Sequence, residues 1–256
     1  MEKLLQVKGL EKVYGTNKGN ALRAVAGVSF DIEKGEFVSI MGPSGSGKTT
    51  LVNCISTIDR PTSGEVLLEG KSIWGMKNKE LAKFRSQSLG FIFQESNLLD
   101  TLTCQENIAL PLTIARRNPA EIKKRVEDKA RYLGIESILN SFPYQVSGGQ
   151  AQRVSAARAL IANPSLVIAD EPTGALDSKN SATLLESLTK INQEDMATIL
   201  MVTHDVFAAS WSHRVLFLRD GRLYTQLVKG DMSRSQFFQE IMSVVGVIGG
   251  GSDVIR

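Results

Sequence analysis

The chain of 256 residues has few cysteines and no long apolar run. Cys54 and Cys104 lie far apart and outside any Cys-x-x-Cys motif, which argues against a disulfide framework or a zinc site and fits a reducing cytosol. No stretch approaches the roughly 18 apolar residues of a membrane-spanning helix, and the strongest candidate, 241–248, is short. The first residues, 1–12, lack the continuous apolar region of a secretory signal. A membrane role would therefore depend on a partner.

The chain also lacks a concentration of charge of one sign. It contains 30 basic and 27 acidic residues, and its densest basic run, 123–125, lies among acidic residues. This mixture is typical of a solvated helix face, whereas nucleic-acid-binding proteins usually gather positive charge into a stripe. We therefore expect no nucleic-acid partner. The hydrophobic fraction of 42% and the charged fraction of 22% are close to those of globular proteins.

Three short apolar runs each end directly in polar residues. The runs are 37–41, 166–169 and 198–202. Nearly continuous apolar runs are typical of parallel strands that are buried on both faces. The polar residues that follow them are Gly42, Asp170, Glu171, Thr203 and His204. Because ligands of open α/β sheets bind at the carboxyl ends of the strands, we expect these groups to lie at one edge of a sheet.

The segment 95–164 has mainly helical patterns and is predicted to be a helical subdomain inserted into the α/β core. Thr103 and Glu106 have the spacing of a capping box at a helix start. Further along the chain, Asp220 and Gly221 separate two apolar stretches and predict a tight hairpin turn.

A P-loop pattern, G-x-x-x-x-G-K-[ST], follows the first apolar run and precedes a helix that is expected to start near Thr50. Its residues are Gly42, Pro43, Ser44, Gly45, Ser46, Gly47, Lys48 and Thr49. In such a loop the backbone amides and the helix N-terminus surround phosphate oxygens, Lys48 neutralises the outer phosphates, and the Thr49 hydroxyl binds magnesium. A glycine-rich turn without a ligand is the alternative, but the strand and helix on either side favour a nucleotide site.

Asp170 and Glu171 follow the second apolar run. Asp170 is placed to hold Mg²⁺ through its water shell, and Glu171 suits a general base that deprotonates the water attacking the γ-phosphate. Without other motifs, two acidic residues at the end of a strand would more simply be solvated surface residues. The P-loop in the same chain favours the catalytic interpretation.

A second glycine-rich helix start lies at 147–150, before a helix expected at 151–162. Ser147 and Gln150 have capping-box spacing, and Gly148 and Gly149 leave the helix end uncovered, as a phosphate site requires. The capping and the phosphate-binding interpretations are compatible.

The segment 146–150, Val-Ser-Gly-Gly-Gln, resembles the signature sequence of the ATP-binding cassette (ABC) ATPases, and the resemblance covers nearly the whole chain. Val146 stands where the family often has leucine, and Ala151 where a longer residue is common. The resemblance implies an α/β P-loop NTPase fold of the ABC type, with a mostly parallel core sheet, an N-terminal antiparallel β part and an inserted helical subdomain. The implied boundaries are 1–94 and 165–230 for the ATP-binding core, 95–164 for the helical subdomain and 231–256 for a family-specific tail.

The resemblance also implies roles for individual residues. Tyr14 matches the aromatic residue that stacks on adenine, Gln94 the glutamine of the loop joining core and helical subdomain, and His204 the switch histidine. Asp177 matches the loop that crosses the dimer interface. In the family, two subunits pair head to tail, so that Ser147 and Gly149 of one chain complete the γ-phosphate site of the other.

The implied catalytic residues are Lys48, Gln94, Glu171 and His204. The implied ATP-binding residues are Tyr14, Gly42, Pro43, Ser44, Gly45, Ser46, Gly47, Lys48, Thr49, Thr50, Ser147, Gly148, Gly149, Gln150 and Asp177. The implied Mg²⁺ ligands are Thr49, Gln94 and Asp170.

Within the family, 91–94 and 169–177 resemble the ATPases of macrolide export, lipoprotein release and peptide-antibiotic resistance. The segments 224–227 and 237–242 resemble those that protect Gram-positive bacteria from bacitracin and from lantibiotics such as nisin. This implies a homodimer at the cytoplasmic face of the cell membrane that drives a separate permease with a large extracellular domain. Such complexes often report to a sensor histidine kinase.

Other functions are compatible with parts of this pattern. A GTPase usually carries an Asn-Lys-x-Asp element, which this sequence lacks. An ATPase of a lipoprotein-release, macrolide-export or cell-division signalling complex would carry the same motifs. ABC proteins of translation or DNA repair usually have two cassettes or a coiled-coil insertion, and this sequence has neither.

Overall fold

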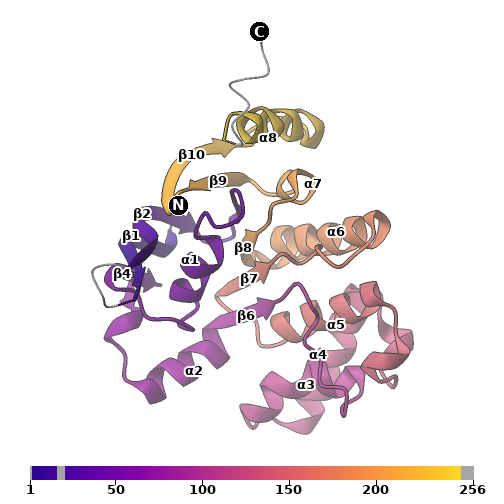
Figure 1. Ribbon diagram of the computed structural model, residues 1–256. Helices are drawn as coiled ribbons and strands as arrows, with labels where there is room; N and C mark the ends of the chain where they lie inside the picture. Colours follow the sequence, from indigo (N-terminus) through magenta and orange to yellow (C-terminus); the bar gives the residue numbers. More distant parts are fainter. Residues whose placement is uncertain (1, 16–20, 249–256) are drawn as a thin grey trace. The chain divides into compact units, whose positions relative to one another are not determined.

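The structure, a computed structural model, describes residues 2–15 and 21–248 (Figure 1). Its contacts divide the chain into two compact units. Unit 1 is formed by 1–81 and 200–256, and unit 2 by 82–199. No helix in the described part of the chain is both long enough and apolar enough to cross a bilayer.

The chain begins with three strands, and helices and further strands follow them. The strands are β1 (Lys3–Tyr14), β2 (Leu22–Glu33), β3 (Phe37–Met41), β4 (Ser63–Leu68), β5 (Lys71–Ser72), β6 (Leu89–Ile92), β7 (Leu166–Asp170), β8 (Thr198–Val202), β9 (Arg214–Arg219) and β10 (Arg222–Val228). The helices are α1 (Lys48–Ile55), α2 (Asn78–Ser88), α3 (Cys104–Ile114), α4 (Pro119–Tyr132), α5 (Gly148–Leu160), α6 (Ser178–Asp195), α7 (Val206–Ala209) and α8 (Arg234–Ile248).

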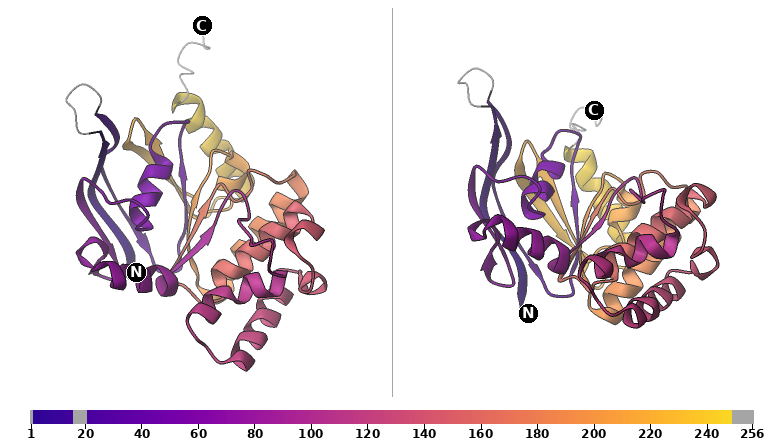
Figure 2. Two further views of the ribbon diagram at one scale, coloured as in Figure 1. Left: turned by 60° about the horizontal axis from the view of Figure 1, so that its bottom comes forward. Right: turned by 90° about the horizontal axis from the view of Figure 1, so that it is seen from below.

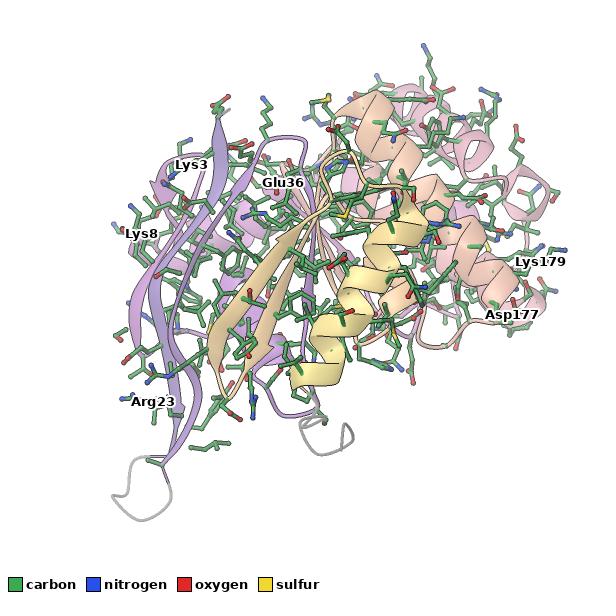
Figure 3. All side chains as sticks on the ribbon, turned by 90° about the horizontal axis from the view of Figure 1, so that it is seen from above. Lys3, Lys8, Arg23, Glu36, Asp177 and Lys179 are labelled. Carbon is green, nitrogen blue, oxygen red and sulfur yellow. The ribbon has the colours of Figure 1, made fainter. Side chains whose placement is uncertain are left out.

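The first sheet of unit 1 is antiparallel, with the strand order β2-β1-β4-β5. Within its strands, Leu5, Leu10 and Ile32 are completely buried. Lys8 of β1 and Arg23 of β2 are exposed (Figure 3). The pairing of β1 with β2 contains several register shifts. These shifts break the strict alternation of buried and exposed residues that identifies a half-buried strand in a sequence.

The second sheet contributes the order β10-β9-β3-β8 to unit 1. Strand β3 runs parallel to β9, and all five of its residues are buried, because it is covered on both faces. Helix α8 packs beside the β9–β10 hairpin and α7 (Figures 1 and 3). Its residues Phe237 and Ile241, one helical turn apart, join a core cluster with Met41 and Phe217.

Unit 2 contains the parallel pair β6 and β7, in which Leu89 lies opposite Leu166 and Ile92 opposite Ala169. Helix α5 packs against β6 and α6, and α3, α4 and α5 contact one another (Figure 2). The capping box of Thr103 and Glu106 begins α3.

The predicted α/β fold is confirmed, including its antiparallel N-terminal part. The core sheet, which was expected to be mostly parallel, is a mixed sheet with parallel strands and an antiparallel β9–β10 pair. The three apolar runs form β3, β7 and β8, and the hairpin turn lies between β9 and β10. The helix expected at 151–162 begins earlier, at Gly148, because the capping box of Ser147 and Gln150 starts it there. Unit 2 contains β6, β7 and α6 in addition to the helical segment, and the predicted domain boundaries stay a prediction. Of the predicted tail 231–256, residues 249–256 lie outside the described part.

Candidate functional site

The P-loop in unit 1 connects the buried strand β3 to α1. A Cβ atom at Gly42 would collide with the carbonyl oxygen of Leu218 in β9, so the chain can leave the sheet here only without a side chain. Gly47 precedes α1 with a φ of +96°, and a Cβ there would collide with the carbonyl oxygen of Ala24. The loop thus passes closely between two strands, and α1 presents its N-terminal amides next to it.

Lys48 lies folded over this loop. Its Nζ donates hydrogen bonds of 2.8 Å to the carbonyl oxygen of Gly42 and 2.9 Å to that of Pro43. Two backbone acceptors therefore hold the ammonium group at the start of the P-loop. Thr49 is exposed in the first turn of α1.

The hairpin turn between β9 and β10 supports the P-loop from the side. The amide of Gly221 donates to the carbonyl oxygen of Ser46 at 3.1 Å, and the carbonyl oxygen of Gly221 accepts from Ala26 at 2.8 Å. The turn thereby ties the P-loop to β2. Ser46 is 2% exposed, and its hydroxyl has no hydrogen-bond partner within the described part of the chain.

Tyr14 ends β1 and is 38% exposed. Its hydroxyl donates to Oδ2 of Asp59 at 2.7 Å, and Nζ of Lys12 lies 4.8 Å from its ring centre. The Asp59 hydrogen bond and partial burial raise the pKa of Tyr14, while a side-chain hydrogen bond with Thr50 acts in the opposite direction. These contacts anchor the ring near the start of α1, next to the P-loop in the sequence.

His204 lies two residues after the end of β8, with Thr203 between them. The amide of its neighbour Thr203 donates to the carbonyl oxygen of Ile40 at 3.1 Å. His204 therefore leaves the sheet at the same edge as Gly42, as predicted from the polar residues after the apolar runs. The side chain of His204 is exposed.

The remaining predicted catalytic residues belong to unit 2. Gln94 follows β6 and Glu171 follows β7, so both leave the parallel pair at its carboxyl edge. A Cβ atom at Gly174 would lie 3.1 Å from Nε2 of Gln94, which shows how closely the two loops approach each other. Asp170 is the last residue of β7 and is partly buried.

Glu171 has a φ of +47°, in the left-handed region that non-glycine residues rarely adopt. Its carbonyl oxygen accepts a hydrogen bond of 3.0 Å from Gly174, which closes a tight turn around Pro172. Such backbone strain costs about 1–3 kcal/mol and is common at catalytic positions, where the surrounding structure holds it in place.

The second glycine-rich segment begins α5. Ser147 is the N-cap, with its Oγ accepting from the amide of Gln150 at 3.3 Å while Oε1 of Gln150 accepts from the amide of Ser147 at 2.9 Å. Ser147 and Gly148 are exposed, and a Cβ at Gly148 would meet no atom within 4 Å. The capping box is confirmed, and it leaves the N-terminal face of α5 open for an anion.

Asn180 joins this helix start to the start of α6. Asp177 caps α6 by accepting from the amide of Asn180 at 2.8 Å, and its second oxygen accepts from Nδ2 of Asn180, also at 2.8 Å. These two hydrogen bonds lower the pKa of Asp177. A Cβ at Gly149 would collide with Oδ1 of Asn180, so the packing of these two helix starts requires glycine at this position.

Each unit offers one of the oxygen donors expected for Mg²⁺, Thr49 in unit 1 and Asp170 in unit 2. Within residues 2–15 and 21–248, no group of three or more His, Cys, Asp or Glu side chains gathers into a metal-binding cluster. Mg²⁺ in nucleotide sites is commonly held by one or two protein oxygens together with substrate phosphates and water. The hydroxyl of Thr49 and the carboxylate of Asp170 are of that type.

Asp59 and Asn180 were missed by the sequence analysis. Asp59 anchors Tyr14 and Lys12 from a loop after α1, and Asn180 lies three residues after Asp177 in α6. Neither belongs to a glycine-rich or strand-end pattern, although the Asp-x-x-Asn spacing of 177 and 180 is a signal of helix capping.

Comparisons with known proteins agree with this geometry. The family model described as "ABC transporter" matches residues 25–174. The chain is 52% identical over 247 residues to the bacitracin export ATP-binding protein BceA of Halalkalibacterium halodurans, covering 96% of this chain and 97% of that protein. It is 41% identical over 220 residues to the macrolide export ATP-binding/permease protein MacB of Mannheimia succiniciproducens, covering 86% of this chain and 34% of that protein.

Among solved structures, the dimeric ATP-binding cassette MJ0796 of Methanocaldococcus jannaschii, bound to ADP and Pi, matches with a TM-score of 0.80 and 40% identity. The match covers 88% of this chain and 98% of that one. The chain therefore belongs to the ABC transporter family, as one of its ATP-binding, ATP-hydrolysing domains.

Proposed function

We propose that the chain powers a separate membrane permease in a transporter that gives resistance to bacitracin and to lantibiotics such as nisin. The observation that carries this proposal is the 52% identity, over nearly the full length of both chains, to a bacitracin export ATP-binding protein. The relation to a macrolide export protein supports a wider class of exporters as the second candidate.

In the proposed mechanism, the P-loop binds the ATP phosphates. Lys48 exchanges its bonds to the carbonyl oxygens of Gly42 and Pro43 for bonds to phosphate oxygens, so little side-chain movement is needed. Tyr14 stacks on adenine with the ring face that Lys12 does not cover. Thr49 and Asp170, with Gln94, would hold Mg²⁺, which would neutralise charge on the phosphates.

Glu171 is the proposed general base. It accepts the proton of the attacking water as that oxygen bonds to the γ-phosphorus and the bond to the ADP oxygen breaks. His204 is proposed to contact the γ-phosphate, and Gln94 to link the site to the permease. The left-handed backbone of Glu171 supports the proposal, because strained conformations of this kind are common at functional sites.

Two copies of the chain are proposed to pair head to tail. Ser147, Gly148, Gly149 and Gln150 of each copy would then complete the ATP site of the other, with Asp177 near the interface. The open N-terminal face of α5 supports this role, since nothing lies within 4 Å of a Cβ placed at Gly148. The dimeric state of the MJ0796 cassette supports the same arrangement.

A groove in unit 2 is the proposed contact for the permease. Its volume is 380 Å³, and it lies between β6, α3 and the end of α5. Phe91 and Phe93 stack along it with ring centres 5.7 Å apart. Arg158 holds the loop after Gln94 by donating to the carbonyl oxygens of Asn97 at 2.7 Å and Ser96 at 2.9 Å. Movement of this loop on ATP binding would therefore change the shape of the groove.

The other proposed partners are those expected of transporters that give resistance to peptide antibiotics. The permease is proposed to carry a large extracellular domain and to report to a sensor histidine kinase, and the ATPase dimer is placed at the cytoplasmic face of the cell membrane. Copurification of this chain with its neighbouring permease from a membrane fraction would support that location.

Growth inhibition by bacitracin and nisin tests the proposal. A sensitive host would express the neighbouring permease with the wild-type chain, with Glu171→Gln, or with Glu186→Gln, a control at an exposed position of α6. We expect resistance from the wild type and the control, and loss of resistance with Glu171→Gln. If the wild type gives no resistance, the peptide-antibiotic class is wrong, and assays of macrolide export, lipoprotein release and cell division then decide among the alternatives.

A further inference from the structure

The side chain of Gln152 is buried in α5, two residues after the capping box, and is 2% exposed. Its Nε2 donates two hydrogen bonds, at 2.6 Å to the carbonyl oxygen of Phe93 and at 3.0 Å to that of Pro172. A single amide group therefore uses both of its protons on the backbone of two loops that are far apart in the sequence.

These two carbonyl oxygens are adjacent to proposed catalytic residues. Phe93 directly precedes Gln94, and Pro172 directly follows Glu171. Gln152 thus joins the loop after β6 to the loop after β7 at the carboxyl edge of the parallel pair. Its contact at Pro172 lies inside the tight turn that gives Glu171 its left-handed backbone.

Gln152 also connects these loops to the helix that carries the signature segment. The exposed N-terminus of α5, at Ser147 and Gly148, is proposed to contact the ATP of a second subunit. A shift of α5 would be passed through the Gln152 amide to the backbone on one side of Gln94 and on one side of Glu171.

We propose that Gln152 is a positioning residue that holds Gln94 and Glu171 in their catalytic placement and makes that placement depend on the position of α5. This inference rests on the proposed roles of Glu171 and of the signature segment. It assigns to Gln152 the coupling between ATP contact at the N-terminus of α5 and the general base of the same chain.

Removal of the amide would leave the partly buried carbonyl oxygen of Phe93 and the buried one of Pro172 without this donor. Neighbouring backbone would then shift, and a displacement of about 1 Å at a catalytic group can reduce turnover by about 10²-fold. Binding of ATP should be affected much less, because the two carbonyl oxygens that Gln152 binds belong to Phe93 and Pro172 and not to the P-loop or Tyr14.

The test is steady-state ATP hydrolysis by the full chain carrying Gln152→Met, which keeps the length of the side chain and removes both donors. We expect kcat to fall by roughly 10- to 100-fold with ATP affinity largely unchanged, and the Hill coefficient for ATP to fall toward one. Asn192→Leu is the matched control. It removes another buried amide of unit 2, which donates to the carbonyl oxygen of Ala197 at 2.8 Å away from these loops, and should lower thermal stability but not kcat.

Gln152→Glu provides a second measurement if the methionine variant folds poorly. Its carboxylate cannot donate to the two carbonyl oxygens, whereas its protonated form can donate to one, and burial raises the pKa of such a group. We expect its kcat relative to wild type to be low at alkaline pH and to rise as the pH falls.

A kcat for the Gln152 variants no lower than that of Asn192→Leu would overturn the positioning role. That result would leave the proposed function intact. By contrast, a wild-type chain without ATPase activity, or a Glu171→Gln variant with undiminished turnover, would reject the proposed catalytic mechanism itself.

Discussion

The hydroxyl of Tyr14 donates a 2.7 Å hydrogen bond to Asp59, and the same carboxylate accepts a 2.6 Å hydrogen bond from Lys12. Lys12 also donates to the carbonyl oxygen of Arg60 at 2.7 Å. Although burial opposes it, the hydrogen bonds from Lys12 and Tyr14 lower the pKa of Asp59, so the carboxylate is charged at neutral pH. The proposed adenine platform is thus fixed by a small ionic network between the end of β1 and the loop after α1.

Tyr14→Ala should weaken ATP binding by the free energy of one base–aromatic stack, about 1–3 kcal/mol. Binding of tripolyphosphate, which has no base, should be unchanged. Tyr14→Phe keeps the ring and removes only the hydrogen bonds that its hydroxyl makes with Asp59 and Thr50, so it should cost less ATP affinity than Tyr14→Ala. Calorimetric titration with both ligands measures the two effects. An equal loss of ATP and tripolyphosphate affinity in Tyr14→Ala would show that Tyr14 supports the P-loop and does not bind the base.

Lys48→Ala should weaken ATP binding by at least about tenfold, because the charge that faces the phosphates is lost. The two carbonyl acceptors of Lys48 lie in a loop that is partly open to water, so stability should change little. Lys8→Ala removes an exposed lysine of the same unit and serves as the control. Calorimetry and thermal unfolding measure both quantities, and normal ATP affinity in Lys48→Ala would reject the P-loop assignment.

Gly148 and Gly149 should respond differently to alanine. Gly149→Ala places a methyl group against Oδ1 of Asn180 and should destabilise the chain by about 1–3 kcal/mol, whereas Gly148→Ala meets no neighbour and should leave stability unchanged. Asn180→Ala should partly relieve the loss of stability caused by Gly149→Ala in the double variant.

Gly148→Ala should still reduce ATP turnover if the N-terminal face of α5 contacts a second subunit's ATP. Chemical denaturation and ATPase assays separate packing from catalysis, and full activity of Gly148→Ala would argue against that contact.

Ile114→Asp should weaken association with the permease while leaving ATP binding unchanged. Ile114 is 68% exposed and lines the 380 Å³ groove in unit 2, so a charge there would oppose burial against an apolar partner. Met196→Asp, at another exposed apolar position of unit 2, is the control. Copurification with the permease measures the effect. Equal recovery of the permease with both variants would place its contact elsewhere.

The elements that were predictable from the sequence have strong local signals. The strands β3, β7 and β8 are uniform apolar runs, and Asp220-Gly221 marks the β9–β10 turn. The individual bounds of β1 and β2 were not predictable, since their register shifts disrupt alternation. The P-loop and capping-box residues were identified by their spacing, and the resemblance to the ABC ATPases implied the roles of Tyr14, Gln94, Asp177 and His204. Gln152 was not identified, because its partners Phe93 and Pro172 are 59 and 20 residues away, and a helical glutamine has no local sign of burial.

The most direct test of the central claim compares ATP turnover and ATP affinity between the wild-type chain and Glu171→Gln, with Glu186→Gln as the control. Glutamine keeps the shape of glutamate but cannot accept the proton of the attacking water. We predict that Glu171→Gln binds ATP normally and slows turnover by about 10² to 10⁴-fold, the usual contribution of a general base, while the control retains full activity. Undiminished turnover in Glu171→Gln would contradict the assignment of Glu171 as the catalytic base of this ATPase.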